Sequence, residues 1–495
     1  MSEFDIARNL LVVLPELGLT ILAIVLLLMD SYLPKGSNRT IAYTAAIAMA
    51  ALAATPLLFP PDETSTLYWG GMIHYDWLSQ IFKVMLLFAG SLTCLIAVKD
   101  HQAGKRGEFY LIITIATLGT SLMAGSADLI MVFVALETLS IPLYVLAAFG
   151  KNTRSSEAGL KYFLYGSFAS GILLYGFSFL YGFAGTTSLE GIASAIANGT
   201  EIVPILAALV MVLVGFGFKI SAVPFHMWTP DVYVGAPTPV TAFLSVASKA
   251  GSFALLIRFL LSVFPADVIV AGQSIQTFWI NLVVVLAVLS MTLGNVLALR
   301  QKNFKRMLAY SSIAQAGYTL VGVAALQSNS DLAIAAISFY MFMYIFTNLL
   351  AFGGLVLVSE ATGSDDISNM AGLNRRNPWI ALAITIGLLS LSGIPPAAGF
   401  FGKFFLFQAA VEANLVLLAI IGVLNAIVAL YYYLVVIKVM YVDHHEDEDQ
   451  PIAMPPAYAW ALGLATVVVI LLGTIAVAPI FDWARLGAQA IIPGF

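Results

Sequence analysis

The sequence contains few of the residues on which redox chemistry depends. Its only cysteine, Cys94, lies in an apolar stretch of the 495-residue chain. A disulfide framework needs paired cysteines and an iron–sulfur cluster needs several thiolates, so the sequence supplies neither. It also lacks a haem motif and a glycine-rich dinucleotide fingerprint between a strand and a helix. We therefore expect the chain to bind no cofactor of its own.

Charge is equally scarce. Charged residues make up 10% of the chain, hydrophobic residues make up 60%, and the net charge is -5. Such a composition excludes a water-soluble protein and indicates an integral membrane protein. Much of the negative charge lies in the segment 443–449, where His444 and His445 adjoin carboxylates. A flexible loop fixes no coordination geometry, so we interpret this segment as a solvated connection and expect no metal site.

Long apolar segments recur along the whole chain. A spanning helix needs roughly 20 apolar residues. The pattern predicts an all-α integral membrane protein with about fourteen transmembrane helices. The predicted spans are Leu10–Met29, Ile41–Phe59, Trp77–Val98, Phe109–Met123, Leu129–Phe149, Phe163–Phe183, Ile205–Val223, Val240–Phe264, Thr277–Leu299, Met307–Leu326, Leu332–Val358, Trp379–Ala410, Leu415–Val442 and Tyr458–Ile480.

The loops between these spans alternate in charge. Basic residues occur in every second loop except the loop from His226 to Pro239, as shown by Lys99 with Lys105 and Arg375 with Arg376, whereas the intervening loops carry acids such as Glu190. Lys and Arg gather on the cytoplasmic side, so the basic loops should face inwards. An even number of spans then predicts that both termini lie on the outer side, with a bacterial cell inner membrane as the expected location.

Two of the predicted spans are interrupted. Pro224 follows Lys219, and Lys403 follows a break at Ser392–Pro396. Corresponding breaks in two halves of a chain indicate inverted repeats, because a break frees backbone groups to face ions or water. The pattern predicts two inverted five-helix repeats, each with a broken helix. The predicted units are three N-terminal spans in 1–108, the first repeat in 109–264, the second repeat in 277–442, and an acidic inner loop with the last span in 443–495.

The candidate functional residues are ionisable groups inside predicted spans, namely Glu137, Lys219, Lys249 and Lys403. A charged group at that depth costs roughly 2.5 to 3.5 kcal/mol or more, so such groups are functional candidates. Pairing a buried Glu with a buried Lys favours both charged forms, whereas separating them favours both neutral forms. A Glu and a Lys that approach and separate can therefore switch their proton affinity.

These residues also have structural interpretations. Glu137 and Lys219 could form a static ion pair, and Lys249 could extend to the inner interface. Lys403 could be paired or extended in the same way, although no acid is near it in the sequence. Three more lysines are typical of interfacial anchors: Lys83, Lys161 and Lys305. Several buried titratable groups on separate helices nevertheless favour a relay over that many unrelated static pairs.

Four segments carry a resemblance to a known family. They are GFGFKISAVPFHMWTPDVY at 215–233, ETLSIP at 137–142, NFKRMLAYSS at 303–312, and SGIP with GFFGKF at 392–404. Together they resemble the antiporter-like membrane subunits of NADH-quinone oxidoreductase, respiratory complex I, over nearly the whole chain. Thr229, Val232, Tyr233 and the lysine at 403 resemble the N-type branch of that family most closely.

The resemblance implies a proton relay. By similarity, Glu137 would tune Lys219, which would exchange protons with the inner side. Lys249 and His226 would connect the two halves, and Lys403 would deliver the proton outwards.

One position departs from the family. Gln315 stands where many relatives carry a histidine, and glutamine cannot titrate. A proton step there would have to use water or a neighbour such as Tyr310 or Ser311. Tyr310 is therefore a secondary relay candidate, together with His226, Lys161 and Lys305.

The resemblance also implies partners. NAD, FMN, iron–sulfur clusters and quinone are expected in partner subunits, and a sister antiporter-like subunit is expected beside this chain in the bilayer, with no nucleic acid involved. Two other functions stay open at this point. One is a subunit of a multisubunit cation/proton antiporter, which shares the fold and the Glu–Lys pair. The other is a quinone-binding enzyme subunit, for which the only signal is the aromatic content of 12%.

Overall fold

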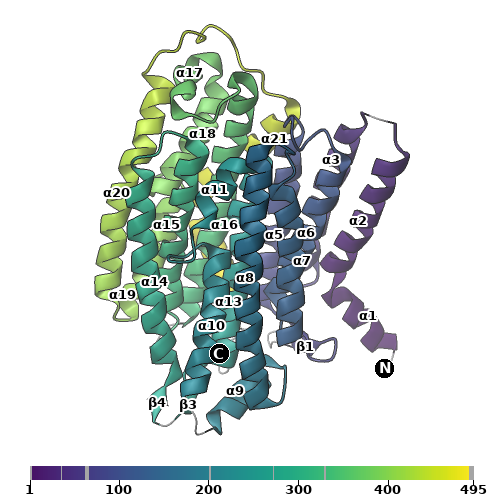
Figure 1. Ribbon diagram of the computed structural model, residues 1–495, viewed down its shortest axis with the longest axis vertical. Helices are drawn as coiled ribbons and strands as arrows, with labels where there is room; N and C mark the ends of the chain where they lie inside the picture. Colours follow the sequence, from purple (N-terminus) through teal and green to yellow (C-terminus); the bar gives the residue numbers. More distant parts are fainter. Residues whose placement is uncertain are drawn as a thin grey trace.

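Long helices run side by side along the longest axis of the molecule (Figure 1). The computed structural model describes residues 3–34, 36–61, 66–199, 202–270, 272–327 and 330–489. Its first part contains α1 (Glu3–Val12), α2 (Leu14–Tyr32), α3 (Asn38–Leu52), α4 (Thr55–Leu58), β1 (Thr66–Tyr68), β2 (Ile73–Tyr75) and α5 (Trp77–Ala97). The strands β1 and β2 pair antiparallel, with Leu67 opposite His74.

The middle of the chain continues the helical pattern. It contains α6 (Gly107–Gly125), α7 (Leu129–Ala147), α8 (Thr153–Ala184), α9 (Leu189–Ala197), α10 (Ile202–Ile220), α11 (Trp228–Gly235), α12 (Thr238–Phe243), the π-helical turn η1 (Leu244–Ser248) and α13 (Lys249–Val263). A second antiparallel hairpin follows, formed by β3 (Ile269–Val270) and β4 (Gln273–Ser274).

The last part of the chain is also helical. It contains α14 (Ile275–Ala298), α15 (Phe304–Ala324), α16 (Ser330–Thr362), the short 3-10 turn η2 (Ile367–Met370), α17 (Leu373–Arg376), α18 (Pro378–Ser392), α19 (Gly399–Glu412), α20 (Val416–Tyr441), α21 (Pro456–Leu472) and α22 (Val477–Gln489).

The prediction of an all-α membrane protein is confirmed by the helices of the structure and by their hydropathy. Within the described residues, eleven helices are long and apolar enough to cross a membrane, or up to twelve if α21 and α22, bent by 89°, form one span. The remaining predicted spans correspond to α15, which is interspersed with polar residues, and to α18 and α19, which have 15 and 14 residues. The count of fourteen and the inverted repeats stay predictions.

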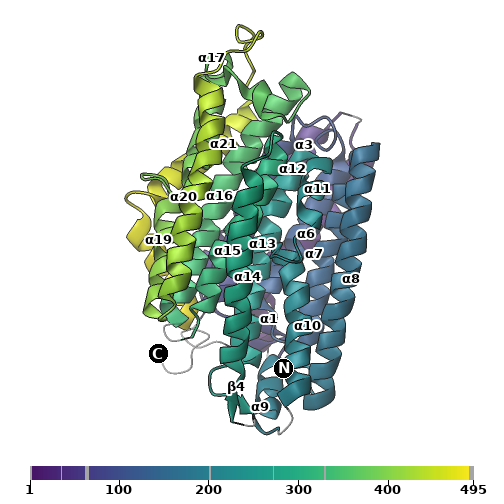
Figure 2. The same cartoon turned by 60° about the vertical axis from the view of Figure 1, so that its left-hand side comes forward.

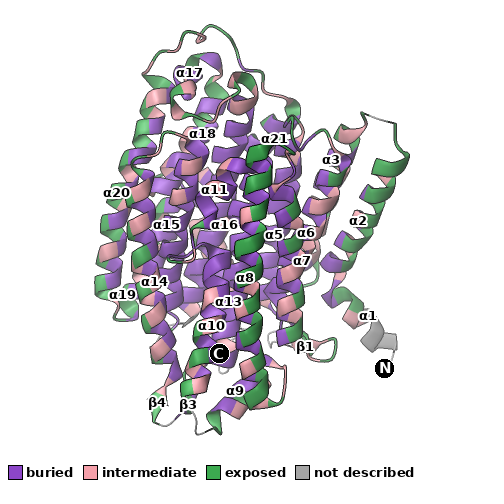
Figure 3. Cartoon of the chain, viewed as in Figure 1, coloured by how far each residue is buried: buried purple, intermediate pink, exposed green. Residues whose placement is uncertain are grey.

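Burial separates inner helices from outer ones (Figure 3). In the most apolar window of α16, 94% of the residues are buried, whereas in α2 and in α20 only 28% are. The outer helices expose large apolar side chains, for example Ile24 on α2 and Ile427 on α20. Because exposed apolar surface on this scale is unfavourable in water, these helix faces are suited to lipid or to a neighbouring membrane subunit.

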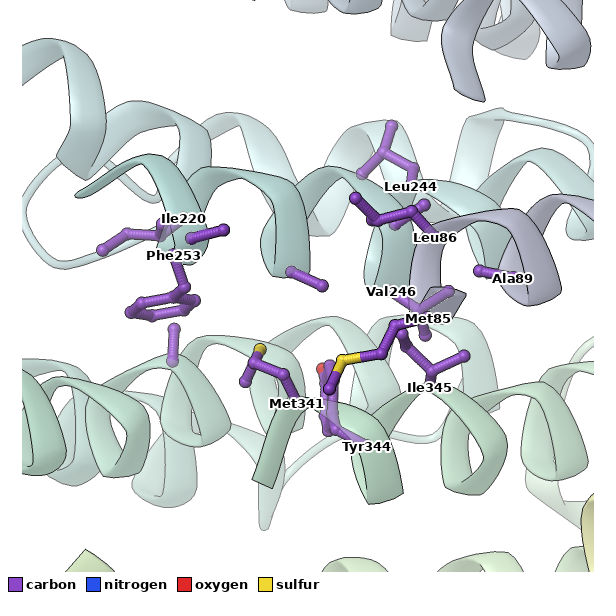
Figure 4. Close-up of a cluster of buried hydrophobic side chains, with 14 of the residues drawn as sticks. Met85, Leu86, Ala89, Ile220, Leu244, Val246, Phe253, Met341, Tyr344 and Ile345 are labelled. Atoms are coloured by element: carbon purple, nitrogen blue, oxygen red, sulfur yellow. The ribbon is translucent and has the colours of Figure 1, made fainter. Parts of the chain in front are cut away.

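The core lies where α5, η1 and α16 meet. Figure 4 shows Met85 and Leu86 of α5 beside Val246 of η1, with Met341 and Ile345 of α16 on the facing helix. All five side chains are buried. This apolar layer holds the two halves of the chain together around the polar groups described below.

A buried ion pair links α5 to α13. The Arg258 guanidinium donates to both carboxylate oxygens of Asp76, at 2.7 and 2.8 Å, and Arg258 Nε donates to the Ala124 carbonyl at 3.1 Å. Asp76 is also the N-cap of α5, accepting the Ser79 N–H at 2.8 Å. The guanidinium holds the pKa of Asp76 below its usual range despite burial, which acts in the opposite direction. Arg258 therefore has a structural role.

The interpretation of Lys83 as an interfacial anchor is wrong. The side chain is 1% exposed and its ammonium lies 3.0 Å from Glu16 Oε1 of α2. Glu16 also accepts a hydrogen bond from Ser121 of α6 at 2.6 Å. Neither the spacing nor the local sequence relates Glu16 to Lys83, so the pairing is visible only once α2 is packed against α5 and α6.

Arg258→Gln should destabilise the fold strongly, because it leaves the Asp76 carboxylate buried without its cation. The expected loss is about 3 to 5 kcal/mol, measured as a lower thermal unfolding temperature of the purified protein. Arg485→Gln is the matched control, since Arg485 is half-exposed and pairs with Asp331 at the surface. Equal losses in the two variants would contradict a special role for the buried pair.

Candidate functional site

The first candidate lysine lies at the end of a broken helix. Lys219 is in the last turn of α10, which ends at Ile220, and the chain resumes as a helix only at Trp228. Ser221 follows with a positive φ of 62°. A helix C-terminus has carbonyl groups without intrahelical donors and a partial negative charge, so it favours a cation. The predicted interruption of this span is therefore present, and it places the ammonium at the break.

The Lys219 ammonium contacts one serine hydroxyl and lies 5.9 and 5.6 Å from the ring centroids of Tyr144 and Phe218. Lys219 Nζ donates to Ser140 Oγ of α7, and the side chain is 4% exposed. Glu137 lies one helical turn before Ser140 and accepts a hydrogen bond from Ser170 of α8 at 2.7 Å. Among the ion pairs of the described residues, none joins Glu137 to Lys219. The static pair, one of the interpretations left open by the sequence, is therefore not formed among the described residues, and Glu137 lies one turn from Ser140, the partner of Lys219, on α7.

Lys249 lies in the middle of the molecule. It begins α13 directly after the π-helical turn η1, an irregularity that often marks functional sites. The side chain is 1% exposed, so it does not extend to an interface. Its ammonium donates to the Ser312 carbonyl at 2.6 Å and to Ser312 Oγ at 2.5 Å. The turned view in Figure 2 places α13 and α15, which carry these two residues, among the central helices.

Lys403 lies at the second break. It belongs to α19, and its ammonium donates back to the carbonyls of Leu391 and Ser392 at the end of α18, at 2.8 and 3.1 Å. It also lies 4.6 Å from the ring centroid of Tyr318. Gly393 closes α18 with a φ of +87°, which favours glycine. No carboxylate contacts this ammonium in the described part of the chain.

Gln315 connects the middle lysine region to Lys403. Gln315 Nε2 donates to the Leu391 carbonyl at 3.0 Å, the same carbonyl that accepts from Lys403. It also donates to the Tyr433 hydroxyl at 3.2 Å, and its Oε1 accepts from Tyr340. An amide with both donor and acceptor can relay hydrogen bonding without titrating.

Ser311, next to the partner of Lys249, completes the connection. Its hydroxyl bonds to the Tyr433 hydroxyl, while Ser312 Oγ bonds to the hydroxyls of Tyr344 at 3.0 Å and Tyr233 at 3.1 Å. The predicted neighbour Ser311 therefore does adjoin Gln315 through Tyr433. Tyr310, the other predicted neighbour, is half-buried and has no side-chain hydrogen bond within the described residues.

Sequence reasoning missed the hydroxyl partners. Tyr340, Tyr433 and Ser312 were unrecognised because a single Tyr or Ser in an apolar helix is usually a packing or belt residue. A signal was present in the spacing of Ser311, Ser312 and Gln315, which recur on one side of α15 at three- and four-residue intervals.

The secondary candidates fall into different settings. His226 is buried in the break between α10 and α11, where its carbonyl accepts the Thr229 N–H at 2.9 Å. Lys161 is partly exposed and pairs with Asp231 and Glu157, both at 2.7 Å. Asp231 also lies 3.3 Å from Arg306. Lys161 is thus part of a surface network, in keeping with an anchor.

Lys305 differs from an anchor because it is buried. Its ammonium donates to the Ala236 carbonyl at 2.7 Å and lies 3.8 Å from Asp365. It lines a cavity of about 940 Å³. The cavity lies between the loops before α6, α8, α12 and α15 and the end of α16, and its lining includes Asp100, Arg154, Arg306, Glu360 and Asp365. A polar cavity of this size can hold water beside Lys305.

Asp100 is the buried carboxyl of this cavity. Burial raises its pKa from 3.8 to about 6, against hydrogen bonds from the Ala103 and Gln102 N–H groups, and nearby Glu360 acts in the same direction as burial. A carboxyl that titrates near neutral pH can exchange protons with water in the cavity.

Comparisons with known proteins identify the family of this chain. Residues 126–429 match the family described as "NADH:quinone oxidoreductase/Mrp antiporter, TM". The chain is 41% identical to NADH-quinone oxidoreductase subunit N of Moorella thermoacetica, covering 92% of this chain and 93% of that one. This chain belongs to that family. All three candidate lysines lie inside the matched region of the family.

Solved structures of relatives share the fold. A chain of respiratory complex I from Thermus thermophilus is 32% identical with a TM-score of 0.78, covering 96% of this chain and 99% of that one. A chain of the Mrp complex from Dietzia sp. is 21% identical with a TM-score of 0.81, covering 99% and 98%. At that lower identity the likeness concerns the fold alone.

If Gln315 connects the two lysine regions of this family member, Gln315→Leu should slow proton translocation several-fold. Leucine fills the space but offers no donor or acceptor to Tyr340, Tyr433 and the Leu391 carbonyl. Gln315→His should retain activity because imidazole can donate and accept. The measurement is proton uptake by sealed vesicles containing the assembled complex, with Gln408→Leu at the surface as control. Full activity of Gln315→Leu would exclude the connection.

The raised pKa of Asp100 should make stability depend on pH. The folded state holds the carboxyl proton more tightly than the unfolded state, so this contribution is present below about pH 4 and is lost as the pH rises through about 6. Asp100→Asn should therefore stabilise the protein relative to wild type at about pH 8 and not at about pH 4. Thermal unfolding at both pH values measures this, with Asp443→Asn in an exposed loop as control. A pH-independent difference would contradict the assignment.

Proposed function

We propose that the chain is the N-type antiporter-like subunit of an NADH-quinone oxidoreductase, and that it translocates protons across the membrane. The observation that carries the proposal is the series of buried lysines held by carbonyls and hydroxyls at helix irregularities: Lys219, Lys249 and Lys403. The family membership and the 41% identity to a relative named subunit N support it.

The proposed route runs along the middle of the chain. Water in the cavity near Asp100 and Lys305 supplies protons from the side of the basic loops. Lys219, tuned by Glu137, and Lys249 exchange the proton, with His226 in the intervening break. From Lys249 it passes along Ser312, the tyrosine hydroxyls and Gln315 to Lys403. Lys161 and Tyr310 are secondary members of the route. Lys161 belongs to a surface network of ion pairs, and Tyr310 makes no side-chain hydrogen bond within the described residues.

The driving force comes from partner subunits. This chain would depend on NAD, FMN, iron–sulfur clusters and quinone held elsewhere in the complex, and on a sister antiporter-like subunit at one of its exposed apolar faces. A charge change passed on by a neighbour would act on Glu137 first, because that residue is only partly buried on α7. Each tenfold change in proton affinity corresponds to about 1.4 kcal/mol.

The proposed topology has fourteen spans and two inverted five-helix repeats, 109–264 and 277–442. The two breaks support it, because in each repeat a helix ends beside a relay lysine: α10 at Lys219 and α18 at Lys403. The basic loops, including that of Arg375, lie at the end marked by α17 in Figure 1. By the positive-inside rule this end faces the cytoplasm of a bacterial cell, and both termini face outwards.

A cation/proton antiporter subunit is the second candidate. The family description, which names the Mrp antiporter beside NADH:quinone oxidoreductase, favours it. The higher identity to relatives named subunit N favours the first proposal, since 41% applies to the Moorella protein and 21% to the Dietzia chain. Coupling to electron transfer distinguishes the two, because only the first depends on a redox reaction.

Lys219→Ala and Lys403→Ala should each abolish proton translocation coupled to quinone reduction while the complex still assembles. Alanine removes the only amine at each helix break, so the series is interrupted. Proton uptake and quinone reduction by sealed vesicles measure this, and Lys302→Ala in an exposed loop is the control. Normal pumping by both variants would make these lysines structural. Pumping that continues without electron transfer would favour the antiporter.

A further inference from the structure

Some basic residues of the basic-loop face are held in ion pairs and others are not. Lys161 and Arg306 both contact Asp231, Arg375 contacts Glu448, and Lys438 contacts Asp443. Arg39 and Lys99 are exposed and, like Arg300 and Lys302, have no place among the ion pairs of the described residues.

Arg39 and Lys99 line one small groove. Its volume is about 310 Å³, and it lies between the first turn of α3, the residues after α5 and the start of α21. The lining residues are Arg39, Tyr43, Val98, Lys99, Ala453, Met454, Pro455, Pro456 and Ala457. No acid is among them, so the groove is positively charged at its polar end and apolar elsewhere. A hydrogen bond from Tyr458 to the Ile96 carbonyl fixes α21 beside α5.

Below the groove, the side chains along one face of α3 change from a cation to an aromatic ring and then to an aliphatic chain. Arg39, Tyr43 and Ile47 are spaced by four residues and therefore lie along one face, each about 6 Å deeper than the last. Tyr43 is 37% exposed and Ile47 68% exposed. The order of cation, aromatic ring and aliphatic chain follows the order of a phospholipid from phosphate to acyl chain.

The helix α21, which also borders the groove, carries a similar series of side chains with increasing depth. Pro456 lines the groove, and Trp460 and Leu464 follow at four-residue intervals on α21, with Trp460 77% exposed. Both α3 and α21 pack against α5. Two exposed stripes of aromatic and aliphatic side chains, one on α3 and one on α21, therefore extend into the membrane from the groove that holds Arg39 and Lys99.

We propose that this groove binds an anionic phospholipid, with the phosphate between Arg39 and Lys99 and the acyl chains along the two stripes. A basic pocket between helices on the cytoplasmic side is suited to such a headgroup. The exposed side chains below the groove favour a lipid over a soluble phosphate, because a phosphate alone would leave Tyr43, Ile47 and Trp460 uncovered. The site is separate from the proton relay and does not depend on the proposed function.

The test uses the assembled complex in nanodiscs of phosphatidylcholine that contain a small fraction of phosphatidylglycerol with a photoreactive acyl chain. After irradiation, labelled peptides are located by mass spectrometry. The expected labels lie in 43–52 and 457–467. Arg39→Gln with Lys99→Gln should lower this labelling on the order of tenfold, because each cation near the surface contributes about 1 kcal/mol to binding an anionic lipid.

Matched controls separate specific from general binding. Arg300→Gln with Lys302→Gln removes two exposed cations from the same end and should leave labelling unchanged. In the wild type, unlabelled phosphatidylglycerol should compete with the probe, whereas phosphatidylcholine and inorganic phosphate should not. This competition experiment tests the proposal even if the double variant fails to assemble.

Four outcomes would overturn the proposal. They are equal labelling by a phosphatidylcholine probe, unchanged labelling in the Arg39 and Lys99 variant, competition by inorganic phosphate, and protection of these peptides by a neighbouring protein subunit in place of lipid.

Discussion

Buried amines must be satisfied in a protein interior that offers almost no acid, and the rest of the site depends on this constraint. An ammonium group inside an apolar bundle requires polar partners at hydrogen-bond distance. Lys403 meets the requirement at a break, because its ammonium donates to the Leu391 and Ser392 carbonyls at the end of α18. Lys219 and Lys249 meet it through serines on neighbouring helices, Ser140 of α7 and Ser312 of α15. Each of the three lysines also lies at or beside an irregular stretch of backbone, namely the ends of α10 and α18 and the π-helical turn η1.

The kind of partner separates the structural charges from the lysines of the proposed relay. Arg258 and Lys83 contact the carboxylates of Asp76 and Glu16, so each of these two buried cations has an oppositely charged partner. Lys249 and Lys403 contact carbonyl and hydroxyl oxygens. A neutral oxygen can accept from an ammonium, and a hydroxyl can donate to the amine after the proton has left. These oxygens hold the ammonium groups by hydrogen bonds and without a counter-charge.

The polar end of the molecule serves two purposes. The cavity beside Lys305 carries both acids and bases and adjoins the loops between the two halves of the chain. The groove at Arg39 and Lys99 carries bases alone and adjoins an apolar stripe. Mixed charge around a cavity of about 940 Å³ suits proton exchange with water, whereas positive charge without an acid beside it, above exposed apolar side chains, suits a lipid headgroup.

Sequence alone determined the membrane class, most helix positions and the four candidate residues, since hydropathy and an isolated charge are local properties that do not depend on packing. It also located both breaks, because Pro224 and the Ser392–Pro396 segment disrupt any helix. Only the tertiary structure decided the partners: Ser312 for Lys249, the Leu391 carbonyl for Lys403, and Glu16 for Lys83. These contacts join residues far apart in the chain on different helices. Which faces of those helices meet is decided by how the whole bundle packs, and no local pattern records it.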